Sequence, residues 1–288
     1  MSAKKYFHIT LQDKPTYVLG DLHGAVDTLR GGIKSRKLSD CNLIIAGDIG
    51  LGFSSYKVHL QEYQYLNKFL QSCNIELIVL RGNHDDPAYF NRDTNIDEHF
   101  LMSNVKVIPD YTVVSVNREN ALLIGGATSI DRKYRIRERK TRINQWLSYH
   151  PKLTYAEADN MFSKGYWEGE QPFLSTDSID ELTEDGILIS TVITHTCPSF
   201  AFPQTKKGVE EWMAYDNKLA DDLDKERGTM DAIYAYLKDK GHEIKEWVYG
   251  HYHTHHQSEY ENVIFTTLYN TDRQFDAHEI ARKDDIYL

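Results

Sequence analysis

Five short segments of the sequence carry side chains that can bind a metal ion, and each segment follows an apolar run. Carboxylate oxygens, an amide oxygen and neutral imidazoles together suit a divalent transition ion such as Mn, Fe, Zn, Co or Ni, and the many imidazoles suit Ca or Mg less well. A single His in such a place is more often a hydrogen-bonded structural residue, so the prediction depends on the whole set. The candidate metal ligands are Asp21, His23, Asp48, Asn83, His195, His251 and His253.

The apolar runs before the first three segments, at residues 17–19, 43–46 and 77–80, predict strands that are buried on both faces. Between the second and third runs, Tyr63, Leu66 and Leu70 recur at helical spacing. Alternating strands and helices predict an α/β fold, in which the carboxyl ends of the strands meet at one crevice. The candidate ligands are therefore expected together at that edge. Further strands are expected at 105–108, 112–116, 122–124, 187–194, 247–249 and 263–267, and a long polar helix at 208–240.

The composition is that of an ordinary globular protein, because 41% of the 288 residues are hydrophobic and 26% are charged. It excludes a disordered, collagen-like or disulfide-scaffold chain. There is no run of about 18 apolar residues to cross a membrane, and no apolar stretch follows the basic residues near the start, so a secretory signal is not expected. Three sparse cysteines predict reduced thiols in a cytoplasmic protein. We see no linker, so residues 1–288 are expected to form a single domain.

Residues 132–142 carry seven bases and one acid, although the whole chain has a formal net charge of −10. They open a stretch, about 131–186, that interrupts the succession of strands and is expected to be a basic and aromatic insertion in the domain. On a helix, four arginines at spacings of three and four residues would form one stripe. The stripe is either a solvated face or an anion-attracting lid over the metals, with Arg132 and Arg135 contacting the substrate. Its members are Arg132, Arg135, Arg139 and Arg142.

Taken together, the ligand-bearing segments resemble the motifs of the calcineurin-like metallophosphoesterases. They read Gly-Asp-x-His-Gly from residue 20, Gly-Asp from 47, Gly-Asn-His-Asp from 82, Thr-His from 194 and Gly-His-x-His from 250. The resemblance implies two mixed β-sheets packed as a sandwich and flanked by helices, with a dinuclear metal centre at one edge. It implies one ion held by Asp21, His23 and His253, a second held by Asn83, His195 and His251, and Asp48 bridging both.

The reaction that the resemblance implies is the hydrolysis of a phosphate ester. Two ions about 3.5–4 Å apart offset the charge of phosphate and turn the water between them into hydroxide near neutral pH, so a metal-bridging hydroxide is the expected nucleophile. Mn is the expected metal. His84 would not bind metal; it would stabilise the phosphoryl group and protonate the leaving alkoxide. Arg81 could contact phosphate through two hydrogen bonds, or it could be an ordinary surface residue.

After Asp48 the sequence departs from the protein Ser/Thr phosphatases of this family. Leu51 stands where those enzymes have the Asp that orients the catalytic His, and Gly52 stands where they have an Arg. A dedicated phosphoprotein phosphatase is therefore in doubt. The group that orients His84 is left open, with Asp85 as the nearest candidate.

Two further segments loosely resemble elements of bacterial and phage members of the family, and the chain is expected to be of that type. Residues 125–132 read Gly-Gly-Ala-Thr-Ser-Ile-Asp-Arg and follow a predicted strand, so their backbone amides could meet an anion. Residues 166–172 read Tyr-Trp-Glu-Gly-Glu-Gln-Pro and close a stretch rich in aromatics.

The leading expectation is a metal-dependent phosphoesterase for a small phosphate monoester or nucleotide-like molecule. A phosphodiesterase or nuclease acting on short nucleic acid is the first alternative, supported by the basic segment and the aromatics near it. A protein phosphatase and a non-catalytic metal-binding scaffold are the others. The net charge disfavours wrapping of long nucleic acid. No membrane partner is expected, and the oligomeric state is left open.

Overall fold

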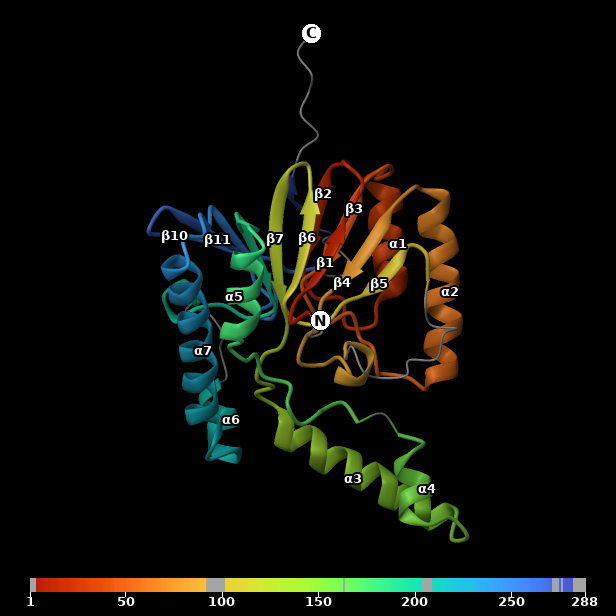
Figure 1. Cartoon of the computed structure of the whole chain (residues 1–288). Coiled ribbons are helices and arrows are strands. Elements are labelled where there is room, and N and C mark those ends of the chain that lie inside the picture. The colour runs from red at the N-terminus through yellow and green to blue at the C-terminus, as the bar shows by residue number, and fades with distance from the viewer. Residues whose placement is uncertain are drawn as a thin grey trace.

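Two mixed β-sheets lie face to face, and helices cover the outer face of each sheet (Figure 1). The computed structural model describes residues 4–91, 102–162, 164–203, 209–270, 275 and 277–281. The α/β sandwich expected from the sequence is therefore confirmed. Among the helices of the described residues, none is both long enough and apolar enough to cross a membrane.

A five-stranded sheet holds the first strands that the sequence predicted, in the order β12-β2-β3-β4-β5. Its strands run parallel, except that β12 is antiparallel to β2. Helices α1 (Val26–Ser35) and α2 (Tyr56–Ser72) link successive strands and pack on the outer face. The strands are β2 Thr16–Leu19, β3 Asn42–Ile45, β4 Glu76–Val79, β5 Val105–Val107 and β12 His278–Ala281.

A seven-stranded sheet has the order β1-β6-β7-β8-β9-β11-β10. The pairs β6–β7 and β10–β11 are antiparallel, and the other pairs are parallel. Helices α5 (Thr176–Glu184) and α7 (Leu219–Asp239) cover its outer face. The strands are β1 Phe7–Thr10, β6 Thr112–Val116, β7 Glu119–Ile124, β8 Thr191–Thr194, β9 Glu246–Tyr249, β10 His256–Tyr260 and β11 Val263–Thr267.

Successive side chains of the central strands enter different apolar layers, because strand side chains alternate between the two faces. In β3, Leu43 and Ile45 pack toward α1 and α2. Ile44, between them, packs between the sheets in the same cluster as Val114 and Val248 of the other sheet. Both sheets thus pack against apolar side chains on both faces, and they carry the loops at the carboxyl ends of their parallel strands.

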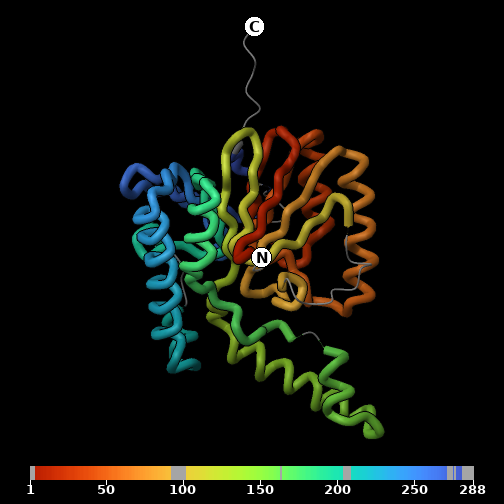
Figure 2. Tube along the Cα trace, in the orientation of Figure 1, coloured from red at the N-terminus to blue at the C-terminus, as the bar shows by residue number. Residues whose placement is uncertain are grey.

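The basic segment forms helix α3 (Arg132–Tyr149), which extends away from the sheets together with α4 (Tyr155–Asp159) (Figures 1 and 2). The insertion expected at 131–186 also contains α5, which instead belongs to the body because Ile179 and Leu182 are buried in the core beside the seven-stranded sheet. The projecting part therefore ends before α5.

The long polar helix expected at 208–240 is two helices, α6 (Val209–Tyr215) and α7, and residue 208 lies outside the described residues. Asp216 stands at the break. Its Oδ1 accepts a hydrogen bond from the backbone N–H of Lys218 at 3.1 Å, and its Oδ2 accepts one from Nε of Arg132 at 2.6 Å. A short side chain that bonds nearby backbone competes with helix formation, and apolar periodicity does not register it.

The edge strands β1, β10 and β12 were not predicted from the sequence. The residues of β1 and β10 are mostly exposed and polar, so these strands lack the apolar run that identifies a buried strand. They form by pairing with β6 and β11. Likewise, β8 covers only the last part of the strand expected at 187–194. Among the described residues, Pro87–Tyr89 and Ser199–Ala201 form short 3₁₀ helices.

Candidate metal centre

The candidate ligands lie in the loops that follow the carboxyl ends of β2, β3, β4, β8 and β9. Three of these loops place non-glycine residues in the left-handed region, with φ of +47° at His23, +54° at Asp48, +69° at His251 and +50° at His253. Such conformations cost on the order of 1–3 kcal/mol each and persist only where the surroundings enforce them. The loops are therefore shaped by their contacts and not by backbone preference.

Glycines let these loops approach one another closely. A Cβ on Gly82 would overlap the backbone and the carboxylate of Asp48, and a Cβ on Gly47 would overlap the imidazole of His195. The loop after β4 therefore lies directly against the loop after β3. There the backbone N–H of His84 donates to Oδ1 of Asp48 at 2.8 Å.

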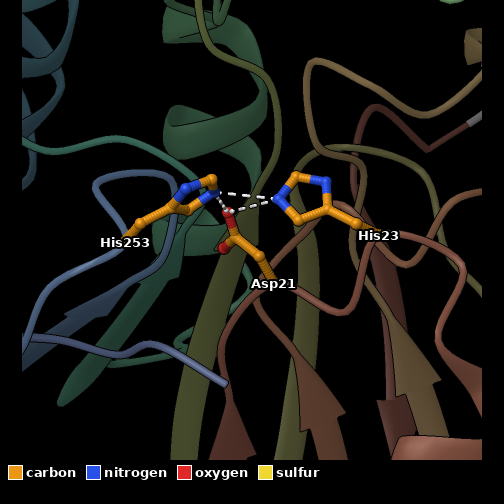
Figure 3. Close-up of side chains that lie close together, drawn as sticks. All are labelled: Asp21, His23 and His253. Carbon is orange, nitrogen blue, oxygen red and sulfur yellow. Dashed lines mark hydrogen bonds and ion pairs between the residues drawn. The ribbon is translucent and has the colours of Figure 1, made fainter. Parts of the chain in front are cut away.

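The first group of donor atoms comes from Asp21, His23 and His253 (Figure 3). Nε2 of His23 and Nε2 of His253 are 2.8 Å apart, and they lie 3.6 Å and 3.1 Å from Oδ2 of Asp21. The two imidazoles thus point at one carboxylate oxygen from different loops. Three donor atoms that face one point in this way fit a divalent cation.

The second group is built around Asn83 and His195. Oδ1 of Asn83 lies 2.9 Å from Nε2 of His195 and 3.1 Å from Nδ1 of His251. Nδ1 of His195 donates to the backbone carbonyl of Ala46 at 2.7 Å, which leaves Nε2 as the nitrogen that faces Asn83 and Asp48. Fixing the tautomer through the other ring nitrogen is typical of imidazoles that bind metal.

Asp48 lies between the two groups. Its Oδ2 is 3.3 Å from Nε2 of His195 and 3.9 Å from Nδ1 of His23. Burial alone raises the pKa of Asp48, but the neighbouring imidazoles outweigh it and hold that pKa well below its ordinary value. Burial lowers the pKa of His195, whereas Asp48 and Asp21 raise it overall, so this place favours positive charge. The donor types, the orientation of the His195 ring and the charge of the carboxylates all fit bound metal ions.

His84 lines the pocket beside these groups and belongs to neither of them. Its Nδ1 is buried and has no hydrogen-bond partner within the described part of the chain. Its Nε2 lies 3.5 Å from Nη2 of Arg135. Burial lowers the pKa of His84 to about 4, so the free ring is neutral at neutral pH. This arrangement leaves Nε2 available to a molecule in the pocket.

Asp85 does not orient His84, which corrects the expectation from the sequence. Its buried carboxylate accepts backbone N–H groups from Gly50 and Leu51 at 2.8 and 2.9 Å, and from Gly82 at 2.9 Å. Burial raises the pKa of Asp85 to about 7. Asp85 therefore ties the loop after β4 to the loop after β3, because polar backbone buried in loops needs an acceptor.

Arg81 does not face the metal pocket, so its expected contact with phosphate is also corrected. The guanidinium is buried; Nη2 pairs with Asp110 at 3.0 Å, and Nη1 donates to the backbone carbonyl of Glu170 at 2.8 Å. An arginine with these partners holds the segment 166–172 against the sheet edge. The sequence could not reveal this because the partners are remote along the chain.

The arginine stripe of α3 is mostly occupied by structural contacts. Nε and Nη2 of Arg132 pair with Asp216 and Asp222, each at 2.6 Å. The expectation that Arg132 contacts the substrate is therefore corrected. Arg139 pairs with Asp159, and Arg142 lies 5.6 Å from the ring centre of Phe162. Of the stripe, only Arg135 is among the residues that line the metal pocket.

The pocket has a volume of about 420 Å³ and is open to solvent. Besides the ligands, His84 and Arg135, its walls include Phe53, Ile130 and Asp131. Asp131 accepts a hydrogen bond from Nε of Arg135 at 2.8 Å, which holds the guanidinium at the pocket wall. The loop 125–132 thus borders the site, as its place after a strand suggested.

Three buried residues behind the ligands, Ser129, Glu170 and Glu226, were not predicted from the sequence. Ser129 accepts a hydrogen bond from Nδ2 of Asn83 at 2.8 Å, and Glu170 accepts from Ser129. Glu226 accepts the hydroxyl of Thr196, the residue after His195, at 2.7 Å. The sequence signals for two of them are the Ser of the Gly-Gly loop, Ser129, and the second Glu after Trp167, Glu170.

Replacing Arg132 by Ala should lower the free energy of unfolding, because it leaves Asp216 buried without its main partner. Removing one partner of a buried ion pair typically costs roughly 3–5 kcal/mol. Arg142→Ala is the matched control on the same stripe, and its exposed cation–π contact should contribute about 0.5–1 kcal/mol. Urea unfolding of both variants checks this. Equal small losses would show that Arg132 is not a structural partner.

Several solved structures are similar to this chain at low sequence identity. A phosphopantetheinyl hydrolase from Mycobacterium tuberculosis is 14% identical with a TM-score of 0.42, over 96% of this chain and 99% of that chain. The protein TT1561 of Thermus thermophilus is 8% identical with a TM-score of 0.47, over 92% and 98%. A cold-active protein-tyrosine phosphatase of a psychrophilic Shewanella is 14% identical with a TM-score of 0.35, over 90% and 72%. No curated protein matches the sequence.

The family model of the calcineurin-like phosphoesterases matches residues 14–255, which is most of the chain. The matched region contains all seven candidate ligands and His84. The chain therefore belongs to the calcineurin-like phosphoesterase family and is a metal-dependent phosphoesterase.

Proposed function

We propose that this phosphoesterase uses two divalent metal ions, Mn foremost, to hydrolyse a small phosphate monoester or a nucleotide-like molecule. The observation that supports this most strongly is that two groups of close donor atoms, Asp21 with His23 and His253, and Asp21 with Asp48 and His195, lie beside the pocket that holds His84 and Arg135. Two carboxylates, one amide oxygen and four imidazoles suit a pair of transition ions.

The ligands divide between the two ions, and the loop after β9 serves both of them, through His253 and His251. Asp21, His23 and His253 would hold one ion, and Asn83, His195 and His251 would hold the other. Asp48 would serve both ions, because a carboxylate has two oxygens and a full negative charge. Bound at these places, the ions supply positive charge to the phosphate and lower the pKa of water.

Arg135 and His84 act on the substrate. The 3.5 Å between Nη2 of Arg135 and Nε2 of His84 lets them contact neighbouring oxygens of one phosphoryl group. An arriving phosphate raises the pKa of His84, against the effect of burial, and so favours its protonated form. Nε2 then donates its proton to the leaving alkoxide as the phosphorus–oxygen bond breaks.

The dimensions of the pocket favour a small substrate. Its volume of about 420 Å³ lies in the range of small-molecule sites, roughly 300–1,000 Å³. Arg135 is the one arginine of the stripe that lines it, so positive charge is concentrated at a single place. A substrate with one or a few phosphates matches this arrangement.

A phosphodiesterase or nuclease acting on short nucleic acid is the second candidate. A groove of about 770 Å³ between α3 and α6 is lined by Tyr134 and Trp212 together with Arg137 and Lys140, which suits stacked bases and phosphates. Arg135 and Arg137, however, lie two positions apart, so they point to nearly opposite sides of α3. A strand would have to cross the helix to reach both sites, so the small substrate is preferred.

We also propose a cytoplasmic location. Cys41, Cys73 and Cys197 form no disulfide, and Cys41 and Cys197 are buried. Free thiols are typical of reducing compartments.

Asp48→Asn should lose metal, because an amide offers one oxygen and no charge where two ions share a carboxylate. The amide oxygen can still accept the N–H of His84, so the loops should keep their shape. Elemental analysis of the purified protein after loading with Mn should show two ions per parent chain and clearly fewer in the variant. Two ions retained in the variant would contradict the bridging assignment.

His84→Ala should keep its metal content and lose on the order of 10²–10⁴ in kcat with p-nitrophenyl phosphate. The loss should be larger for an alkyl phosphate, whose leaving group needs a proton more than nitrophenolate does. Steady-state assays with both substrates, alongside metal analysis, check this. A variant without metal would place His84 among the ligands instead.

Arg135→Ala should reduce kcat/KM for p-nitrophenyl phosphate by about 10–100-fold, since hydrogen bonds to charged groups contribute about 1.5–3 kcal/mol. Arg137→Ala removes an exposed arginine of the same helix that faces the groove, and it should change this value little. Assaying bis(p-nitrophenyl) phosphate and a short oligonucleotide in parallel separates the candidates. Stronger losses in Arg137→Ala on the oligonucleotide alone would favour the nuclease.

A further inference from the structure

Asn83 can present either end of its amide to the metal centre, and only its oxygen can bind a cation. In the structure, Oδ1 faces His195 and His251, at 2.9 and 3.1 Å. Nδ2 faces the opposite way and donates to Oγ of Ser129 at 2.8 Å. The partner behind the amide therefore decides whether Asn83 is a ligand.

Ser129 acts as a hydrogen-bond acceptor toward Asn83 when Glu170 is ionised. A serine hydroxyl has one proton, and the hydroxyl of Ser129 donates it to Oε2 of Glu170 at 2.6 Å. The backbone N–H of Ser129 donates to Oε1 of the same carboxylate at 2.7 Å. With its proton committed, Oγ accepts from Nδ2, and the amide oxygen must point toward the imidazoles.

All three residues are 1% exposed, so water does not compete for these bonds. The backbone around them is also fixed: the carbonyl of Glu170 accepts from Ala127 at 3.1 Å and from Nη1 of Arg81 at 2.8 Å. Burial raises the pKa of Glu170 to about 8, and cations held near Asn83 act in the opposite direction. Bound metal and an ionised Glu170 therefore favour each other.

We propose that Ser129 and Glu170 are positioning residues that hold Asn83 with its oxygen toward the metal centre. The inference rests on the proposed two-metal function. It gives a use to the Ser of the segment 125–132 and to the Glu of the segment 166–172, which the reaction itself does not employ. Arg81 supports the same chain of contacts through the backbone of Glu170.

Mn binding to the whole protein tests the proposal, measured by titration calorimetry and by electron paramagnetic resonance of the bound ions. Ser129→Ala should weaken one of the two ions by about 10–100-fold, the usual effect of losing a residue that orients a ligand, and leave the other unchanged. The resonance of a coupled pair should give way to that of single ions. Excess Mn should restore hydrolysis of p-nitrophenyl phosphate.

Thr128→Val is the matched control. It removes a neighbouring buried hydroxyl whose oxygen has no hydrogen-bond partner in the described residues, and it keeps the backbone bond from Thr128 to Glu226. Both ions should bind to it with the parental affinity. If Thr128→Val loses the same ion, the effect comes from disturbing the loop, and the proposal is wrong.

Glu170→Gln tests the positioning proposal if Ser129→Ala does not fold. The amide of Gln can donate to Oγ of Ser129, which frees the hydroxyl to donate to Asn83 and lets that amide turn. The same single-site loss is expected. Parental affinity for both ions in the folded variants overturns the positioning proposal alone, whereas a parent protein that binds fewer than two ions overturns the proposed function and this inference with it.

Discussion

The arrangement of the site depends on how the negative charge of two buried carboxylates, Asp21 and Asp48, is compensated. Their exposed fractions are 0% and 1%, and a charge removed from water costs several kcal/mol unless it is paired. The backbone N–H groups of His84 and His251 each donate to one of them, and imidazoles surround both. The left-handed residues and the closely packed glycines exist because these partners must come from loops of different strands. Bound metal ions would add to the same compensation.

The cost of leaving a buried charge unpaired also explains the contacts that the arginines of α3 make. Asp216 is buried between α6 and α7, and Arg132 is its partner, so that arginine joins α3 to the body. Arg139 does the same within the insertion through Asp159. Arg135 remains at the pocket because its own partner, Asp131, lies on the pocket wall. Most arginines of the stripe thus form structural contacts, and Arg135 alone among them lines the metal pocket.

Behind the ligands, a layer of buried acceptors holds the loops. Asp85 ties two ligand loops together through backbone N–H groups, and Glu226 holds the hydroxyl next to His195. Glu170 holds Ser129 and, through it, Asn83. Carboxylates suit this task because each offers two oxygens to donors from separate segments. Acids that look like catalytic candidates in the sequence can therefore be structural, and Asp85 is the example.

The sequence alone determined the α/β class, the central strands and the seven candidate ligands, because each depends on local pattern: apolar runs buried on two faces, and donor residues directly after them. It did not determine the edge strands, whose exposed residues form strands only by pairing with β6 and β11. Nor did it determine the break at Asp216 or the partners of Arg81, Arg132 and Asp85. Those depend on which charged group lies opposite, and Arg132 and Asp216 are 84 positions apart in the chain. Only the tertiary structure brings such groups together, so only it could separate the arginine at the pocket from the arginines that hold the fold.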